Sequence, residues 1–144
     1  AAVSYFDSAY IAKFYLDEPD SDAVRALAVS LGRVCCSGFG RVEVNSVFHR
    51  KWREGAYGES ACKEICAQFD DDCAAGLWTW LPISENLIDE VSKSVRQLPR
   101  TTFLRSGDAL HIVSARENGL NIIYSNDRQF LAAAKYLGVK AKSV

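Results

Sequence analysis

The chain has 144 residues, of which 49% are hydrophobic and 24% charged, and its formal net charge is −1. This length predicts one globular domain over residues 1–144, while the near-neutral charge counts mildly against nucleic-acid binding, where a strongly basic balance is common. The longest uncharged stretch, residues 73–84, is too short to cross a bilayer, so we expect no membrane span.

Hydrophobic spacing along the chain predicts short strands that alternate with amphipathic helices. In chain order, strands are expected at residues 3–6, 34–38, 78–83 and 120–124, with a short strand or tail at 139–144. Helices are expected at residues 10–18, 20–31, 40–55, 58–74, 87–98, 107–117 and 125–138. Pro82 indicates that the third strand lies near a sheet edge or ends there, because proline cannot donate a ladder hydrogen bond.

This alternation of short apolar strands and helices is typical of a parallel sheet covered on both faces. We therefore expect an α/β fold, a single-domain three-layer sandwich with a mostly parallel sheet of about four to five strands and helices on both faces. No internal repeat, low-complexity tract or domain linker interrupts the pattern.

The five cysteines, at positions 35, 36, 62, 66 and 73, form no regular disulfide framework. Their odd number favours reduced thiols and hence a cytoplasmic protein. The opening AAVSYFD also lacks the basic start and long apolar run of a signal peptide. Positions 62, 66 and 73 share one helix face, where buried apolar cysteine is favoured over a metal site, since no CxxC motif or histidine is near.

Four acidic residues follow predicted strands or begin predicted helices: Asp7, Glu43, Asp108 and Asp127. Each alone is explained by capping of a helix N-terminus. Together they are expected at the carboxyl edge of the sheet, where open α/β sheets bind ligands. Converging carboxylates need a compensating cation, and hard oxygen ligands favour Mg²⁺ or Mn²⁺ over zinc. Two such ions about 4 Å apart can promote phosphodiester cleavage.

Four segments in the same order carry a resemblance to the PIN-domain ribonucleases, and in particular to the VapC-type toxins of toxin–antitoxin pairs. The segments are YFDSAYIAKFYLDEPDSDAV, FGRVEVNSVFHRKWREG, LRSGDALHIVSARENGL and IIYSNDRQFLAAAKYLGV. Their order and spacing fit over essentially the whole chain. One departure is visible, because many family members have two hydroxyl residues after the opening Asp, whereas this chain has Ser8 followed by Ala9.

The resemblance implies single-strand-selective RNA cleavage with one or two Mg²⁺ or Mn²⁺ ions. It places the acids of the family at Asp7, Glu43, Asp108 and Asp127. Asp7 and Asp108 are then the principal metal ligands, Glu43 completes the ligand set or orients water, and Asp127 holds a second ion or acts through water. The hydroxyls of Ser8 and Ser125 are expected to hydrogen-bond the ligands.

Three arginines neighbour the acids in sequence and are candidates for phosphate contacts: Arg41, Arg105 and Arg128. Residues 41–53 and 93–105 concentrate basic side chains, although each cluster is also typical of a solvated helix face. The resemblance further implies a small antitoxin protein as partner and a homodimer. The aromatic stripe of Tyr10, Phe14 and Tyr15 suggests an apolar groove for a partner helix or for a second copy of the chain.

Two other functions are compatible with parts of the pattern. A phosphatase with Asp7 as aspartyl nucleophile usually needs a second Asp two residues later, and Ala9 stands there. A non-catalytic PIN-like binding module would keep the fold, but the intact set of four acids argues against it.

Two histidines and a tryptophan pair carry weaker signals. His111, three residues after Asp108, is interpreted as a packed or hydrogen-bonded helix residue rather than a catalytic one, and His49 as a surface residue. For Trp78 and Trp80, core packing is favoured over stacking on bases.

Overall fold

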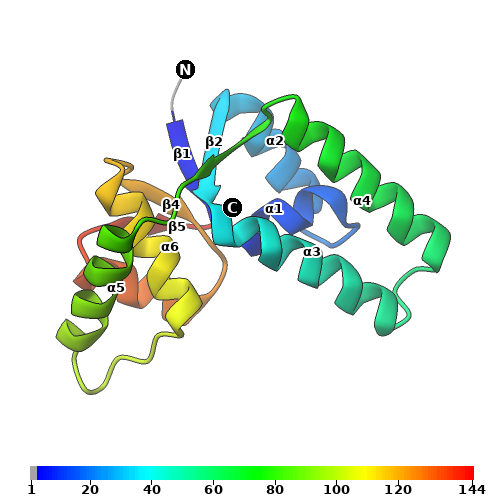
Figure 1. Ribbon diagram of the computed structural model, residues 1–144. Coiled ribbons are helices and arrows are strands. Elements are labelled where there is room, and N and C mark those ends of the chain that lie inside the picture. Colours follow the sequence, from blue (N-terminus) through cyan, green and yellow to red (C-terminus); the bar gives the residue numbers. More distant parts are fainter. Residues whose placement is uncertain (1–2) are drawn as a thin grey trace.

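The computed structural model describes residues 3–144, and residues 1–2 lie outside the described part (Figure 1). The strands are β1 (Val3–Phe6), β2 (Arg33–Ser37), β3 (Trp78–Leu81), β4 (Ile122–Tyr124) and β5 (Lys140–Lys142). The helices are α1 (Ser8–Tyr15), α2 (Ser21–Leu31), α3 (Gly38–Arg53), α4 (Glu59–Ala74), α5 (Glu85–Gln97), α6 (Ser106–Glu117) and α7 (Arg128–Tyr136). Over residues 3–144, no helix combines the length and apolar character that a membrane span requires.

The strands form one parallel sheet in the order β3-β2-β1-β4-β5, which confirms the expected α/β architecture. Strand β1 is central and pairs with β2 on one side and with β4 on the other. The chain moves outward from β1 to β2 and β3, then returns across the sheet to β4 and β5. The strand order therefore reverses beside β1, and open α/β sheets bind ligands at such a reversal.

The helices divide between the two faces of the sheet. Helices α1–α4 lie on one face, and α5 and α6 lie on the other (Figure 1). Right-handed crossovers require this division, because the first two and the last two crossovers run in opposite directions along the sheet. Helices α3 and α4 contact each other and project together beyond the sheet (Figure 1).

An aromatic cluster fills the core between the sheet and helices α1–α4. Phe48 and Phe69 are fully buried and meet edge to face with ring centroids 5.6 Å apart. Trp78 is 2% exposed and donates its indole N–H to Tyr15 Oη at 2.7 Å. Aromatic pairs that meet edge to face contribute about 0.5–1.5 kcal/mol to stability, in addition to the contribution of the area that they bury. Trp78 therefore packs in the core, as the sequence indicated.

Two boundaries show how local chemistry sets the ends of elements. Strand β3 lies at the edge of the sheet and stops immediately before Pro82, as expected for a residue without an N–H donor. Helix α1 ends at Tyr15, earlier than its apolar spacing suggested, because Leu16 is extended. The Arg25 side chain from α2 donates to the carbonyl oxygens of Phe14 and Leu16, which satisfies the end of the helix.

Candidate active site

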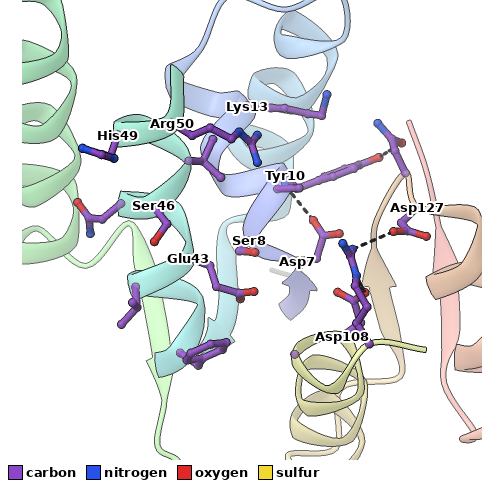
Figure 2. A pocket seen from close by; sticks show the side chains of 18 of the residues that line it. Asp7, Ser8, Tyr10, Lys13, Glu43, Ser46, His49, Arg50, Asp108 and Asp127 are labelled. Carbon is purple, nitrogen blue, oxygen red and sulfur yellow. Dashed lines mark hydrogen bonds and ion pairs between the residues drawn. The ribbon is translucent and has the colours of Figure 1, made fainter. Parts of the chain in front are cut away.

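The carboxyl ends of β1 and β4 open into a cleft of about 1180 Å³. Asp7 directly follows β1, and Asp127 follows β4 after Ser125 and Asn126. Glu43 reaches the same cleft from α3 and Asp108 from the first turn of α6 (Figure 2). The structure thus brings all four acids predicted from the sequence to one cleft at the strand-order reversal.

Asp7 is the most deeply buried of these acids, with 7% of its surface exposed. Its Oδ1 accepts the Tyr10 N–H at 2.8 Å and so caps α1. Burial raises the pKa of Asp7 from 3.8 to about 6, although the Ser125 side chain and the Tyr10 N–H lower it. The nearby Asp108 raises this pKa further, so a cation in the cleft would lower the cost of ionising Asp7.

Arg105 bridges two of the acids and compensates one of their two negative charges. Its Nε lies 3.0 Å from Asp108 Oδ2, and one of its terminal nitrogens lies 3.2 Å from Asp127 Oδ2 (Figure 2). Asp127 Oδ1 also accepts the N–H groups of Gln129 and Phe130, which caps α7. The guanidinium is 65% exposed and therefore can be displaced from this bridge at small cost.

Glu43 is held by a buried histidine. Glu43 Oε1 lies 2.5 Å from His111 Nε2, and His111 is 1% exposed. On the other side of the ring, His111 Nδ1 lies 2.6 Å from Tyr5 Oη, which in turn accepts the Ser37 N–H at 2.8 Å. Burial lowers the pKa of His111, but the neighbouring Cys36 and Glu43 side chains raise it to about 10. The interpretation of His111 as a hydrogen-bonded helix residue is confirmed.

The link from His111 to Glu43 was not found by sequence reasoning. The available signal was the position of His111, one helical turn after Asp108 and therefore near the cleft. Tyr5 gave no signal, because an aromatic residue inside a buried strand is indistinguishable from ordinary core packing.

The other expected site residues are placed as follows. Ser8 lines the cleft, and Ser125 is fully buried and acts on the pKa of Asp7. Of the three arginines expected to contact phosphate, only Arg105 lines the cleft. Burial raises the pKa of the Cys73 thiol, and the charge of Arg41, exposed on α3, partly offsets this rise, so Arg41 lies on the side of α4. Arg128 is exposed at the start of α7.

Further basic side chains lie around the cleft, and most of them come from the basic segment 41–53, where His49 is exposed as expected. Lys13 from α1 and the α3 residues His49, Arg50 and Arg53 line its wall. Figure 2 shows Lys13, His49 and Arg50 on the opposite side of Asp7 from Asp108. The cleft therefore has an acidic floor and a partly basic rim.

The donor chemistry of the cleft fits a hard divalent cation. Its acids offer carboxylate oxygens, and the buried Asp7 lacks a cationic partner at hydrogen-bond distance among residues 3–144. Within the same residues, no three His, Cys, Asp or Glu side chains stand close enough to form a ready-made metal cluster. Arg105 occupies one oxygen of each of two acids, Asp108 and Asp127, so it competes with an ion for these two oxygens.

A second hollow, of about 540 Å³, lies between α1 and α4. Its apolar lining is Phe14, Tyr15, Ile65 and Leu77, so two members of the expected aromatic stripe contribute to a groove. Tyr10, the third member, is fully buried and donates its hydroxyl to Asn126 Oδ1 at 3.0 Å. All five cysteines are free thiols.

The fold and the cleft define an α/β domain with four carboxylates at the point where its strand order reverses. The sequence pattern of the PIN domain matches residues 4–136, and the chain belongs to this family, whose members are generally nucleases.

Solved structures with the same fold include two bacterial proteins. The FitAcB structure from Neisseria gonorrhoeae has a TM-score of 0.75 and 14% identity, and the alignment covers 96% of this chain and 95% of that chain. VapC20 from Mycobacterium tuberculosis, described as a sarcin–ricin loop cleaving toxin, has a TM-score of 0.70 and 16% identity, over 92% and 95% of the two chains. A comparison with curated protein sequences gives no match.

Proposed function

We propose that this chain is an endoribonuclease that requires one or two Mg²⁺ or Mn²⁺ ions. The observation that supports it most is the buried Asp7, which shares one cleft with Glu43, Asp108 and Asp127. A buried carboxylate near other carboxylates destabilises the folded state unless a bound ligand offsets this cost. A cation bound in the cleft would offset this cost.

The four acids would have different roles in binding the ions and the attacking water. Asp7 and Asp108 would be the principal ligands, Glu43 would complete the set or orient water, and Asp127 would hold a second ion or act through water. When bound, the ions would supply positive charge that offsets the carboxylates and the charge developing on the scissile phosphate. Ser125 would keep the Asp7 carboxylate in place through its hydroxyl.

RNA is the proposed substrate, and the rim of the cleft suits a polyanion. Arg105 at the acids and Arg50 and Arg53 on the opposite wall offer positive charge to phosphates on both sides of the cleaved bond. In-line attack by water on phosphorus would displace the 3′-hydroxyl. The phosphatase alternative lacks its second acid, since position 9 is Ala at the cleft wall.

The biological setting we propose is a toxin–antitoxin pair of the VapBC type, acting in the cytoplasm. The family and the likeness to VapC20, itself described as a toxin, support this setting. The antitoxin would be a small protein, and the toxin itself would be a homodimer. Co-purification with the product of a neighbouring reading frame and light scattering of the isolated chain would test the two assemblies.

Cleavage of a labelled single-stranded RNA tests the activity. We expect cleavage with Mn²⁺ or Mg²⁺, none with chelator, and a loss of about 100-fold or more in Asp7→Asn and Asp108→Asn, because each removes charge stabilisation worth several kcal/mol. The matched control is Asp89→Asn, which makes the same change on an exposed residue of α5.

Three outcomes would reject parts of this proposal. Unchanged cleavage in both cleft variants would reject the site. RNA binding without cleavage under any divalent ion would favour the non-catalytic module. Trapping of a phosphoenzyme at Asp7 would favour the phosphatase.

A further inference from the structure

A chain of buried hydrogen bonds runs from the centre of the sheet to the Glu43 carboxylate. It begins at the Ser37 N–H, which donates to Tyr5 Oη at 2.8 Å, and continues from Tyr5 to His111 Nδ1 at 2.6 Å. It ends where His111 Nε2 meets Glu43 Oε1 at 2.5 Å. Tyr5 and Ser37 are fully buried, and both lie on strands at the middle of the sheet.

At the Glu43 end of this series of hydrogen bonds, the direction of the bond is the same for both charge states of His111. If His111 is neutral, the ring proton must be on Nε2, because an ionised Glu43 has no proton to donate, and Nδ1 then accepts from the Tyr5 hydroxyl. If His111 is charged, both ring nitrogens carry protons, and Nε2 again donates to Glu43. In either state Glu43 Oε1 accepts a hydrogen bond and is fixed by it.

Among residues 3–144, the remaining oxygen of Glu43 has no hydrogen-bond partner. An added Cβ at Gly107 would lie 3.5 Å from Glu43 Oε2, so this oxygen lies beside the first turn of α6, next to Asp108. Glu43 is therefore held by one oxygen while the other is directed along the acidic floor of the cleft.

The packing around His111 leaves the imidazole no room to move. The site requires glycine at position 40, where a Cβ would run into Cys36 Sγ and would lie 3.2 Å from His111 Cε1. Tyr5 packs edge to face on the His111 ring with centroids 5.7 Å apart. Neighbours on β1, β2 and α3 thus hold the imidazole ring of His111, which in turn holds the Glu43 carboxylate.

We propose that His111 and Tyr5 are positioning residues that orient Glu43 for a divalent cation and so set the affinity of the cleft for it. The inference rests on the proposed function, because it assumes that Glu43 contributes to the cation site. It goes further in assigning a role to two residues that do not line the cleft. The alternative is that His111 has only a structural role, in which it packs in the core and hydrogen-bonds the buried polar groups around it.

A set of substitutions that remove or keep individual hydrogen-bonding groups separates the positioning role from the purely structural one. His111→Leu removes the donor, and His111→Gln keeps an N–H near the position of Nε2. Tyr5→Phe removes only the hydroxyl that orients the ring. Tyr15→Phe is the matched control, because it also removes a hydrogen-bonded hydroxyl from the aromatic core, and Tyr15 lines the second hollow and not the cleft.

The measurement is Mn²⁺ affinity of the full chain by calorimetry, without RNA. Loss of a residue that orients a metal ligand typically costs about 10- to 100-fold in affinity. We expect a loss in this range for His111→Leu, a smaller one for Tyr5→Phe, recovery of most of the affinity in His111→Gln, and none lost in Tyr15→Phe. In a Glu43→Gln background, His111→Leu should have no further effect, since the two residues act through one carboxylate.

The outcomes distinguish this inference from the proposed function. Full Mn²⁺ affinity in folded His111→Leu, or equal losses with and without Glu43, would overturn the positioning role. If His111→Leu does not fold, Tyr5→Phe decides, and unchanged affinity in that variant would overturn it. If Asp7→Asn also binds Mn²⁺ like the unmodified chain, the proposed metal site itself is wrong.

Discussion

Replacing Asp7 with Asn should abolish cleavage and at the same time stabilise the protein. The Asn side chain keeps the shape of Asp and an oxygen that accepts the Tyr10 N–H, so the cap of α1 is preserved. What is removed is a buried negative charge beside other acids. Enzymes commonly accept such destabilising groups where function requires them.

The size of the effect follows from the pKa of Asp7, which burial raises from 3.8 to about 6. The folded state keeps this proton up to about pH 6, whereas the unfolded chain releases it near 3.8. The free energy of unfolding therefore decreases as pH rises from about 4 to about 6. Above that range it is lower by about 3 kcal/mol than at low pH. For a chain of this size it corresponds to roughly 6–12 °C in Tm.

Thermal unfolding with chelator, at about pH 4 and about pH 7.5, tests this reasoning. We expect Asp7→Asn to unfold at a higher temperature than the unmodified chain at the higher pH and at nearly the same temperature at the lower pH. Mn²⁺ should stabilise the unmodified chain and leave the variant unchanged, because a ligand stabilises only the state that binds it. A variant that is less stable than the unmodified chain at the higher pH would refute the argument.

Two further substitutions probe the surroundings of the cleft. In Gly40→Ala the new methyl group would run into Cys36 Sγ, so urea denaturation should give a free energy of unfolding lower by about 1–3 kcal/mol, and equal stability would contradict the packing described. In Arg105→Ala the acids Asp108 and Asp127 lose an exposed ion pair worth up to about 1 kcal/mol, so Mn²⁺ should bind up to about fivefold more tightly in calorimetry. Weaker Mn²⁺ binding in that variant would show that Arg105 supports the ion site instead of competing for it.

Much of the fold could be predicted from the sequence because its local signals agree with one another. Alternation of short apolar strands with helices led to the parallel sheet, and Pro82 led to an edge position for β3. The early end of α1 could not be predicted, because it depends on Arg25 from the next helix, which reaches the carbonyl oxygens of Phe14 and Leu16. Apolar spacing alone does not contain that contact.

The site was predictable to the extent that it follows from topology. Parallel strands bring their carboxyl ends to one edge, so Asp7 and Asp127 could be expected there before any distance was known. Contacts between side chains far apart in the sequence were not predictable. The bridge from Arg105 to Asp127 and the bond from Tyr5 to His111 depend on three-dimensional packing that no local pattern encodes.

The pairing of β1 with β4 has a consequence for when the chain acquires a complete cleft. Asp7 and Glu43 come from the first half of the chain and Asp108 and Asp127 from the second, and β4, which leads to Asp127, joins the sheet by pairing with the central strand β1. Such distant pairings form late and slowly during folding, because closing a long loop costs entropy before the contacts reward it. A nascent or truncated chain that ends before β4 therefore carries three of the four carboxylates and lacks Asp127, and assembly of the cleft coincides with completion of the sheet.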